Sequence, residues 1–282
     1  MVRKMQTPPL LTDRMALTRN RKRALQAPEL FLHAEAAVEI QERLNEVNRS
    51  FTAPAIVTGF PDFWQNVLPK ARIVPDADVL ALTENTHDLI IHAMALHWAN
   101  DPVGQLVQCR RALRPDGLFL GLMFGGQTLN QLRSALAGAE TSVSGGLSPR
   151  VLPMGEIRDL GGLLQRAGFA LPVADSLTQT VRYRDIFHLM ADLRAMGEAN
   201  ALQQRLRQPT CRAIFTKAEQ IYRDTYQDNE GRIPATFEVI CLTGWAPADN
   251  QQKPLRPGSA THRLADQLGA DETPLPRGQS DG

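Results

Sequence analysis

The sequence has almost no net charge and no long hydrophobic run. Lys and Arg number 31 against 30 Asp and Glu, which leaves a formal net charge of +1. No overall field therefore attracts nucleic acid or an anionic membrane. The longest apolar run, residues 118–124, is far too short to cross a bilayer. We expect a soluble protein without a nucleic-acid partner or a transmembrane segment, while peripheral membrane association stays open.

Cysteine is also scarce. The 282 residues contain three, namely Cys109, Cys211 and Cys241, far apart and each beside apolar residues. This pattern is typical of reduced thiols in a protein core and indicates a reducing compartment. The N-terminus is basic, but prolines interrupt it before any apolar signal segment forms. We therefore predict a cytoplasmic protein.

The first half of the chain alternates between strands and helices. Apolar stretches predict strands at 55–58, 71–74, 88–96 and 118–124, and helices are predicted at 29–49, 61–68 and 102–113. Because the strands are apolar throughout, they indicate a parallel sheet covered on both faces, which is an α/β fold. The basic run between Arg19 and Arg23 is interpreted as a solvated helix face.

After residue 125 helical patterns dominate. They predict helices at 128–140, 155–169, 185–196 and about 201–226, and an antiparallel pair of strands at 171–182 and 235–245. We predict three parts: an N-terminal helical segment (1–50), an α/β domain (51–246) with a helical insertion at about 127–226, and a flexible tail (247–282).

Two strings around the central strands resemble class I S-adenosylmethionine-dependent methyltransferases. They are "ENTHDLIIHAMALHWANDP" and "ALRPDGLFLGLMFGG". Within that superfamily, "FGGQTLNQLR", "GGLSPRVLP" and "GRIPATFEVICLTGWAP" are similar to the methyltransferase-like assembly factor of respiratory complex I, over about residues 84–246. The resemblance implies a Rossmann-like sheet. Since 59–88 holds about one βαβ unit where two are expected, we predict truncation on the strand 2/3 side, with the helical insertion before the last two strands.

The chain departs from the family where the cofactor should bind. The family's first strand ends in a loop with three glycines, but here Gly59 is followed by Pro61 and Phe63 in the other two glycine places. Pro61 lacks an N–H donor, and Phe63 places a ring where S-adenosylmethionine should approach. The acidic residue expected to hold the ribose is also missing. We therefore predict weak or absent binding of S-adenosylmethionine.

Some residues resemble remnants of the cofactor site. The resemblance assigns Gly59, Ala93 and the pair Asp76–Ala77 to it, the pair facing the adenine. A surface turn is the equal alternative for Asp76 and Ala77. His97 follows a strand end, where ligands bind in open α/β sheets, and it is a candidate catalytic base. Aromatic packing with Trp98 is the alternative. The six histidines are scattered, so no metal site is predicted.

Three functions follow from the resemblance. The first is a pseudoenzyme that binds a protein partner, a complex I subunit or assembly intermediate, through Thr128, Gln131, Arg133 and Arg150 on an exposed ridge and loop. The second is an active methyltransferase acting on a small molecule or a carrier protein. The third is a protein arginine hydroxylase, an activity to which the assembly-factor family is linked. The degraded loop favours the first.

Overall fold

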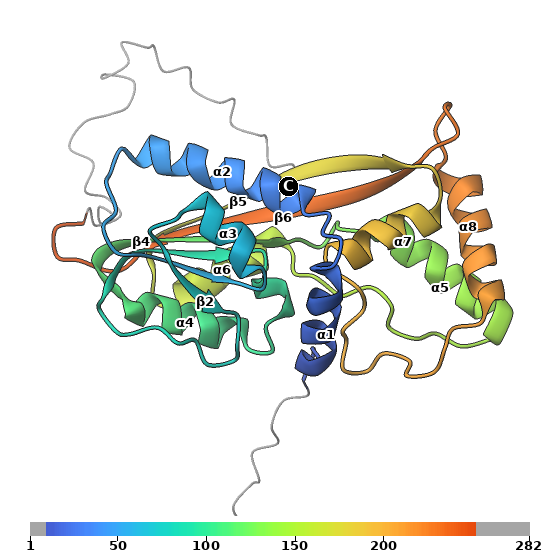
Figure 1. The fold of residues 1–282 in the computed structure, drawn as a ribbon, viewed down its shortest axis with the longest axis horizontal. Coiled ribbons are helices and arrows are strands. Elements are labelled where there is room, and N and C mark those ends of the chain that lie inside the picture. The colour runs from blue at the N-terminus through green and yellow to red at the C-terminus, as the bar shows by residue number, and fades with distance from the viewer. Residues whose placement is uncertain (1–9, 252–282) are drawn as a thin grey trace, which may run out of the picture. The chain divides into compact units, whose positions relative to one another are not determined.

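The computed structural model describes residues 10–251, and they contain a six-stranded sheet with the order β2-β1-β3-β4-β6-β5 (Figure 1). Strands β1 to β4 are parallel to one another, and β6 runs antiparallel between β4 and β5. The strands are β1 (Pro54–Thr58), β2 (Arg72–Pro75), β3 (His87–Ala93), β4 (Leu113–Phe124), β5 (Ala170–Tyr183) and β6 (Ile233–Trp245). The protein has a Rossmann-like α/β fold, as predicted.

The sheet ends at β2 within this part of the chain. One helix, α3 (Pro61–Val67), joins β1 to β2, and residues 76–86 connect β2 directly to β3 without a helix. Pro61 occupies the first turn of α3, where its missing N–H has no intrahelical partner to lose. The predicted truncation on the strand 2/3 side is therefore present.

Helices cover both faces of the sheet. Neighbouring residues of β1 enter opposite cores, Ile56 on the face of α2 (Phe31–Val47) and α3, and Val57 on the face of α4 (Pro102–Ala112) and α6 (Ile157–Arg166). The other helices are α1 (Arg14–Ala24), α5 (Asn130–Ser144), α7 (Ile186–Ala195) and α8 (Arg212–Tyr226). Figure 1 shows α5, α7 and α8 grouped together beside the long strands β5 and β6.

Several sequence predictions need correction. The helix expected from 201 begins only at Arg212, because residues 201–211 form an irregular segment that includes a β-bridge between Leu202 and Thr12. The helical insertion is not continuous, since β5 separates α5 and α6 from α7 and α8. Cys211 is exposed, whereas Cys109 and Cys241 are buried free thiols.

The helix predicted around Arg19 and Arg23 is α1, but its basic face is not fully solvated, because Arg21 is buried. No helix between residues 10 and 251 is long and apolar enough to cross a membrane. The tail predicted at 247–282 lies almost entirely outside the described residues, and the proposed domain limits stay predictions.

Candidate functional site at the carboxyl edge of the sheet

The loop after β1 is filled by aromatic packing. Phe60 is buried, and its ring centroid lies 4.9 Å from that of His33 on α2. The indole N–H of Trp64 donates a hydrogen bond of 3.1 Å to Nδ1 of His33. Burial lowers the pKa of His33 to about 4, so the imidazole stays neutral and can accept that bond. The segment that should carry glycines is part of the core between α2 and α3.

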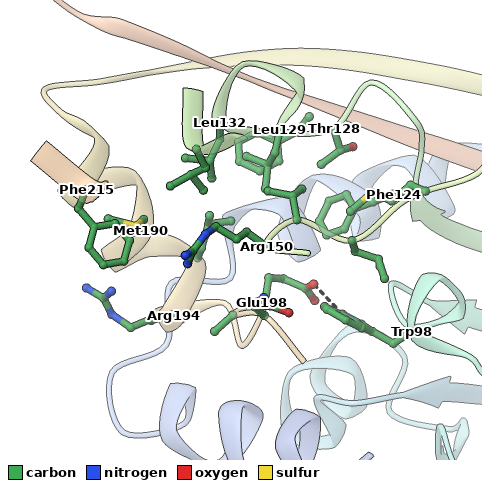
Figure 2. Close-up of a pocket in the computed structure, with 18 residues that line it drawn as sticks. Trp98, Phe124, Thr128, Leu129, Leu132, Arg150, Met190, Arg194, Glu198 and Phe215 are labelled. Carbon is green, nitrogen blue, oxygen red and sulfur yellow. Dashed lines mark hydrogen bonds between the residues drawn. The ribbon is translucent and has the colours of Figure 1, made fainter. Parts of the chain in front are cut away.

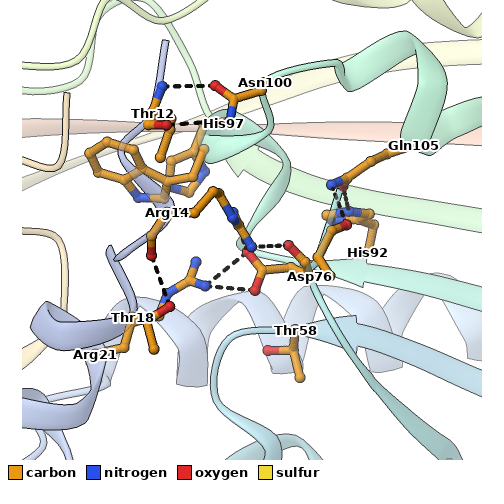
Figure 3. Close-up of polar contacts among 12 residues, drawn as sticks. Thr12, Arg14, Thr18, Arg21, Thr58, Asp76, His92, His97, Asn100 and Gln105 are labelled. Atoms are coloured by element: carbon orange, nitrogen blue, oxygen red, sulfur yellow. Dashed lines mark hydrogen bonds and ion pairs between the residues drawn. The ribbon is translucent and has the colours of Figure 1, made fainter. Parts of the chain in front are cut away.

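An ion pair between α1 and the segment after β2 lies at the same edge of the sheet. Nη1 of Arg21 lies 2.7 Å and 2.8 Å from the two carboxylate oxygens of Asp76 (Figure 3). Arg14 adds a contact of 3.3 Å to the same carboxylate and also donates to the backbone carbonyl of Asp76. Burial raises the pKa of Asp76, but the guanidiniums of Arg21 and Arg14 outweigh it and leave that pKa below its usual range. We call Arg14, Arg21 and Asp76 the α1 clamp.

The clamp occupies the space over Gly59. A Cβ atom built on Gly59 would lie 2.3 Å from Cζ of Arg21, so the guanidinium fills the volume that a cofactor would need above this glycine. Asp76, the acidic residue that the family resemblance assigns to the cofactor site, is paired with two arginines. The residues at this position therefore do not fit S-adenosylmethionine, because the Arg21 guanidinium lies over Gly59 and the Asp76 carboxylate is paired with two arginines.

The other residues that the resemblance assigns to the cofactor site, Ala77 and Ala93, lie near the same edge of the sheet. Ala77 is exposed, and its carbonyl accepts a hydrogen bond of 3.0 Å from Gln105. The other end of that amide lies 2.8 Å from Nε2 of His92. Ala93 is fully buried at the end of β3. Sequence reasoning found Asp76 as a surface turn or a site residue, but it missed Arg14 and Arg21, which follow no motif.

His97 and Trp98 follow β3 in a single 3-10 turn and share one acidic partner. The indole N–H of Trp98 donates to Oε2 of Glu198 at 2.7 Å, and Nε2 of His97 lies 3.3 Å from the same oxygen. Burial raises the pKa of Glu198, but His97, Arg21 and the hydrogen bond from Trp98 outweigh burial. They leave that pKa below its usual range, so the carboxylate is charged. Glu198 carried no recognisable sequence signal, and a catalytic role for His97 stays a prediction.

The residues predicted to bind a partner are not on an exposed ridge. Thr128 is buried, and its hydroxyl donates to the carbonyl of Glu238 and accepts from the Glu238 N–H, both at 3.0 Å. Gln131 is half-buried and bonds Thr236 of β6 at 2.6 Å and 3.2 Å. The expectation of an exposed polar ridge is therefore wrong for these two residues, because Thr128, just before α5, and Gln131, on α5, both bond to β6.

The two arginines of that group are also held within the protein. Arg150 is half-buried and forms a forked ion pair with Glu140, with contacts of 2.8 Å and 3.0 Å, which lowers the pKa of Glu140 to about 2. Arg133 is half-buried and donates to the carbonyls of Thr128 and Leu152, each at 3.4 Å. Their predicted role in partner binding remains untested.

A cavity of about 260 Å³ lies beside Glu198 and between the helices of the predicted insertion (Figure 2). Its walls are mainly apolar, and the polar or charged lining side chains are Thr128, Arg150, Arg194, Glu198 and Asn200. The principal apolar lining residues are Trp98, Phe124, Leu129, Leu132, Met154, Met190, Phe215 and Phe237. Two of the four partner-binding candidates, Thr128 and Arg150, line this cavity.

Comparisons with known proteins point to one family. A family described as methyltransferase domain matches residues 36–121. The chain is 36% identical over 242 residues to human "Arginine-hydroxylase NDUFAF5, mitochondrial", covering 85% of this chain and 70% of that protein. It is 42% identical over 194 residues to the mouse protein of the same name, covering 69% and 56%. A malonyl-[acyl-carrier protein] O-methyltransferase of Laribacter hongkongensis is 34% identical over 188 residues, covering 67% and 61%. The chain spans 56% to 70% of the length of these relatives.

Proposed function

Because the chain belongs to the family of the methyltransferase-like NDUFAF5 proteins, we propose that it is a non-methylating binding protein that assists the assembly of respiratory complex I. Its role in this proposal is to capture a protein partner, a complex I subunit or an assembly intermediate. The α/β fold then serves as a scaffold whose cofactor position is closed by the chain's own side chains.

The observation that carries the proposal is the α1 clamp above Gly59. Arg21 and Asp76 have side chains that are 9% and 7% exposed, so the pair is shielded from water as well as close. Methyl transfer depends on holding the sulfonium and the nucleophile in line, and the protein contributes little else. The clamp and the packed Phe60 take the volume in which that holding would occur.

The family likeness supports the complex I part of the proposal, since the relatives are mitochondrial NDUFAF5 proteins and the sequence strings resemble the complex I assembly factor. The cavity beside Glu198 supports partner capture, because it is formed by elements outside the degraded loop. These elements carry the strings "FGGQTLNQLR" and "GGLSPRVLP" that are similar to the family.

The test is a pull-down with the tagged chain from its native host, combined with complex I assembly measured in a deletion strain. We expect recovery of a complex I subunit and reduced assembled complex, both restored by the wild-type gene. Normal assembly in the deletion strain, together with no recovered subunit, would contradict the proposal.

Two other functions have specific support. The identity to a malonyl-[acyl-carrier protein] O-methyltransferase favours methyl transfer to a small molecule or a carrier protein, and the names of the mammalian relatives favour arginine hydroxylation. Among the described residues, one group of three side chains offers ligand atoms close enough together for a metal ion, namely Glu39, Asp175 and Cys241. Arg43 bonds both of its carboxylates at 2.6 Å, so this group does not fit a metal ion. Mass spectrometry of the captured subunit distinguishes an added methyl group, an added oxygen and no change.

A further inference from the structure

Strand β5 has one edge without a partner strand. It is the last strand in the sheet order, and within residues 10–251 it pairs only with β6 (Figure 1). It is also long, since it extends over Ala170–Tyr183. The free edge of a strand presents N–H and C=O groups that can pair with another chain. This edge of β5 is therefore a candidate site for the addition of a further strand.

The hydrogen bonds of β6 show which groups of β5 face outwards. The N–H and the carbonyl of Glu238 both bond to the segment that follows β4, so they point away from β5. Thr178 of β5 lies opposite Glu238. In an antiparallel ladder, a pair that does not bond to itself directs the N–H and C=O groups of both residues away from each other. Thr178 therefore presents its N–H and carbonyl at the free edge, and so do Ser176 and Thr180, two positions away on either side.

The usual protection of a free edge is missing from the middle of β5. Natural sheets block such edges with lysine, proline, a bulge or a covering element. Pro172 and the register shift between Ala170 and Val173 protect only the beginning of the strand. Residues 176–181 contain neither a charged residue nor proline, and four of them are exposed. We call residues 176–181 the open edge.

A groove lies beside the open edge on the face of α2. Its volume is about 230 Å³, and Leu122, Leu177 and Val239 contribute to it from the neighbouring strands β4, β5 and β6. Leu177 is 42% exposed although it is apolar, and Val38 of α2, which also lines the groove, is 56% exposed. An added strand would therefore gain apolar contact on this face of the sheet.

The groove is also acidic. Glu35, Glu39 and Glu42 of α2 line it. Arg43 bonds to Glu39 but also to Asp175 of β5, so two carboxylates share its single charge. Glu35 and Glu42 are exposed and have no hydrogen bond or ion pair with residues 10–251. The groove therefore has a net negative charge, which favours a cationic occupant.

This charge distinguishes a partner protein from a second copy of the chain. Antiparallel pairing of β5 with β5 of a second copy requires a two-fold axis perpendicular to the joined sheet. Both α2 helices then lie on the same face, and the acidic groove of one copy faces that of the other. Like charges in such an arrangement are unfavourable. A strand with cationic side chains is favoured instead.

We propose that the open edge of β5 accepts a further β-strand from a partner protein, and that this strand directs lysine or arginine side chains towards Glu35 and Glu42. The outward N–H and carbonyl groups of Ser176, Thr178 and Thr180 supply the main-chain hydrogen bonds, and the groove selects the side chains. This inference rests on the proposed function, because it names how the captured partner is held.

Three peptides separate the parts of this proposal. The first is a fluorescein-labelled heptapeptide in which lysine alternates with valine. In the second, glutamate replaces lysine. The third has the lysine–valine sequence with a methyl group on every peptide nitrogen, so it keeps the charge but donates no main-chain hydrogen bond. Binding to the full chain is measured by fluorescence anisotropy at low salt, and hydrogen exchange followed by mass spectrometry locates the bound peptide.

We expect the lysine–valine peptide to bind with a dissociation constant in the high micromolar to millimolar range. It should slow hydrogen exchange in residues 173–183 but not in β2, which is the other edge strand of the sheet. The glutamate peptide and the methylated peptide should each bind about tenfold more weakly, because the first reverses the charge and the second loses the main-chain bonds.

Two variants test the same two parts in the protein. Thr178→Pro removes one outward N–H, and proline is tolerated where an edge N–H faces solvent, so the ladder with β6 is retained. Binding of the lysine–valine peptide should fall about tenfold in this variant. Glu35→Lys/Glu42→Lys should lower the affinity for the same peptide about tenfold and raise that for the glutamate peptide. Thermal unfolding checks that each variant is folded, and the charge variant decides the test if Thr178→Pro is not.

The controls change charge outside the groove. Glu84→Lys/Asp224→Lys is the matched variant, because it reverses two exposed carboxylates that do not line the groove. Arg166→Glu changes an exposed residue of α6 in the opposite sense. Neither should alter the binding of any of the three peptides.

Equal binding of the three peptides, no binding of the lysine–valine peptide, or unchanged binding by Glu35→Lys/Glu42→Lys would overturn the inference. So would a dimer of the wild-type chain in sedimentation equilibrium that Thr178→Pro dissociates, because a second copy then occupies the edge. If the peptides fail but wild type and Glu35→Lys/Glu42→Lys recover a complex I subunit equally well, this inference is wrong and the proposed function stands. If the peptides bind as expected but no subunit is recovered, the site is supported and the proposed function is contradicted.

Discussion

Replacing Arg21 with methionine tests the α1 clamp. The variant keeps the apolar stem of the side chain and removes the guanidinium that contacts both oxygens of Asp76 at 2.7 Å and 2.8 Å. Asp76 then remains buried with Arg14 alone, which is 3.3 Å away and has a side chain 26% exposed. Removing one partner of a buried ion pair destabilises by about 3–5 kcal/mol. Because Arg14 retains part of the pairing, we expect a loss of about 2–4 kcal/mol.

The loss should depend on pH with a defined sign. In the wild type the pKa of Asp76 is lowered, so its pairing stabilises the fold above about pH 4 and this contribution fades as the pH falls. In Arg21→Met the burial of Asp76 is less compensated and its pKa rises. Protonation then relieves the buried charge, and the difference between variant and wild type should shrink from pH 7 to pH 4.

Urea denaturation followed by tryptophan fluorescence measures both quantities. Arg19→Met is the matched control, since Arg19 lies on the same helix and is exposed. The double variant Arg21→Met/Asp76→Asn should lose less than the sum of the single variants, because the two side chains interact. A loss at pH 7 within about 0.5 kcal/mol of the control, which is the range of ordinary surface substitutions, would refute the reasoning.

Three further predictions concern the same elements. His33 and His92 each have a pKa lowered to about 4 by burial, so stability should fall from about pH 6.5 towards pH 4, by on the order of 2–3 kcal/mol per histidine, in unfolding curves measured across this range. Gly59→Ala should displace Arg21, because the new Cβ would lie 2.3 Å from its Cζ, and should destabilise by about 1–3 kcal/mol in thermal unfolding. Arg150→Glu should destabilise the fold rather than act only on a partner, because it faces Glu140 with a second carboxylate; thermal unfolding no different from that of Arg166→Glu would contradict this.

The positions of the strands follow from patterns that the sequence carries locally. Apolar runs and turns placed β1, β3 and β4 within a few residues, and the alternation after Val173 gave the antiparallel pair of β5 and β6. The loss of glycines after Gly59 indicated a closed loop, and the structure places Phe60 in the core there. These features depend on neighbouring residues, which a sequence displays directly.

The side chains that close the site could not be predicted in the same way. Arg21 and Asp76 are separated by 55 positions, and Glu198 reaches Trp98 across 100. No spacing rule connects residues so far apart, so a basic run was interpreted as solvated although one member of it is buried. Thr128 and Gln131 were misplaced for a related reason, because their partners on β6 lie 110 and 105 positions away.

Isothermal titration of the purified chain with S-adenosylmethionine, and separately with S-adenosylhomocysteine, tests the central claim most directly. The claim is that Arg21, Asp76 and Phe60 occupy the volume of the cofactor site. The account predicts a dissociation constant in the millimolar range or no measurable heat, for both compounds. A dissociation constant near 1 μM corresponds to about −8 kcal/mol of binding free energy. Such a value would show that the clamp opens readily and would contradict the account.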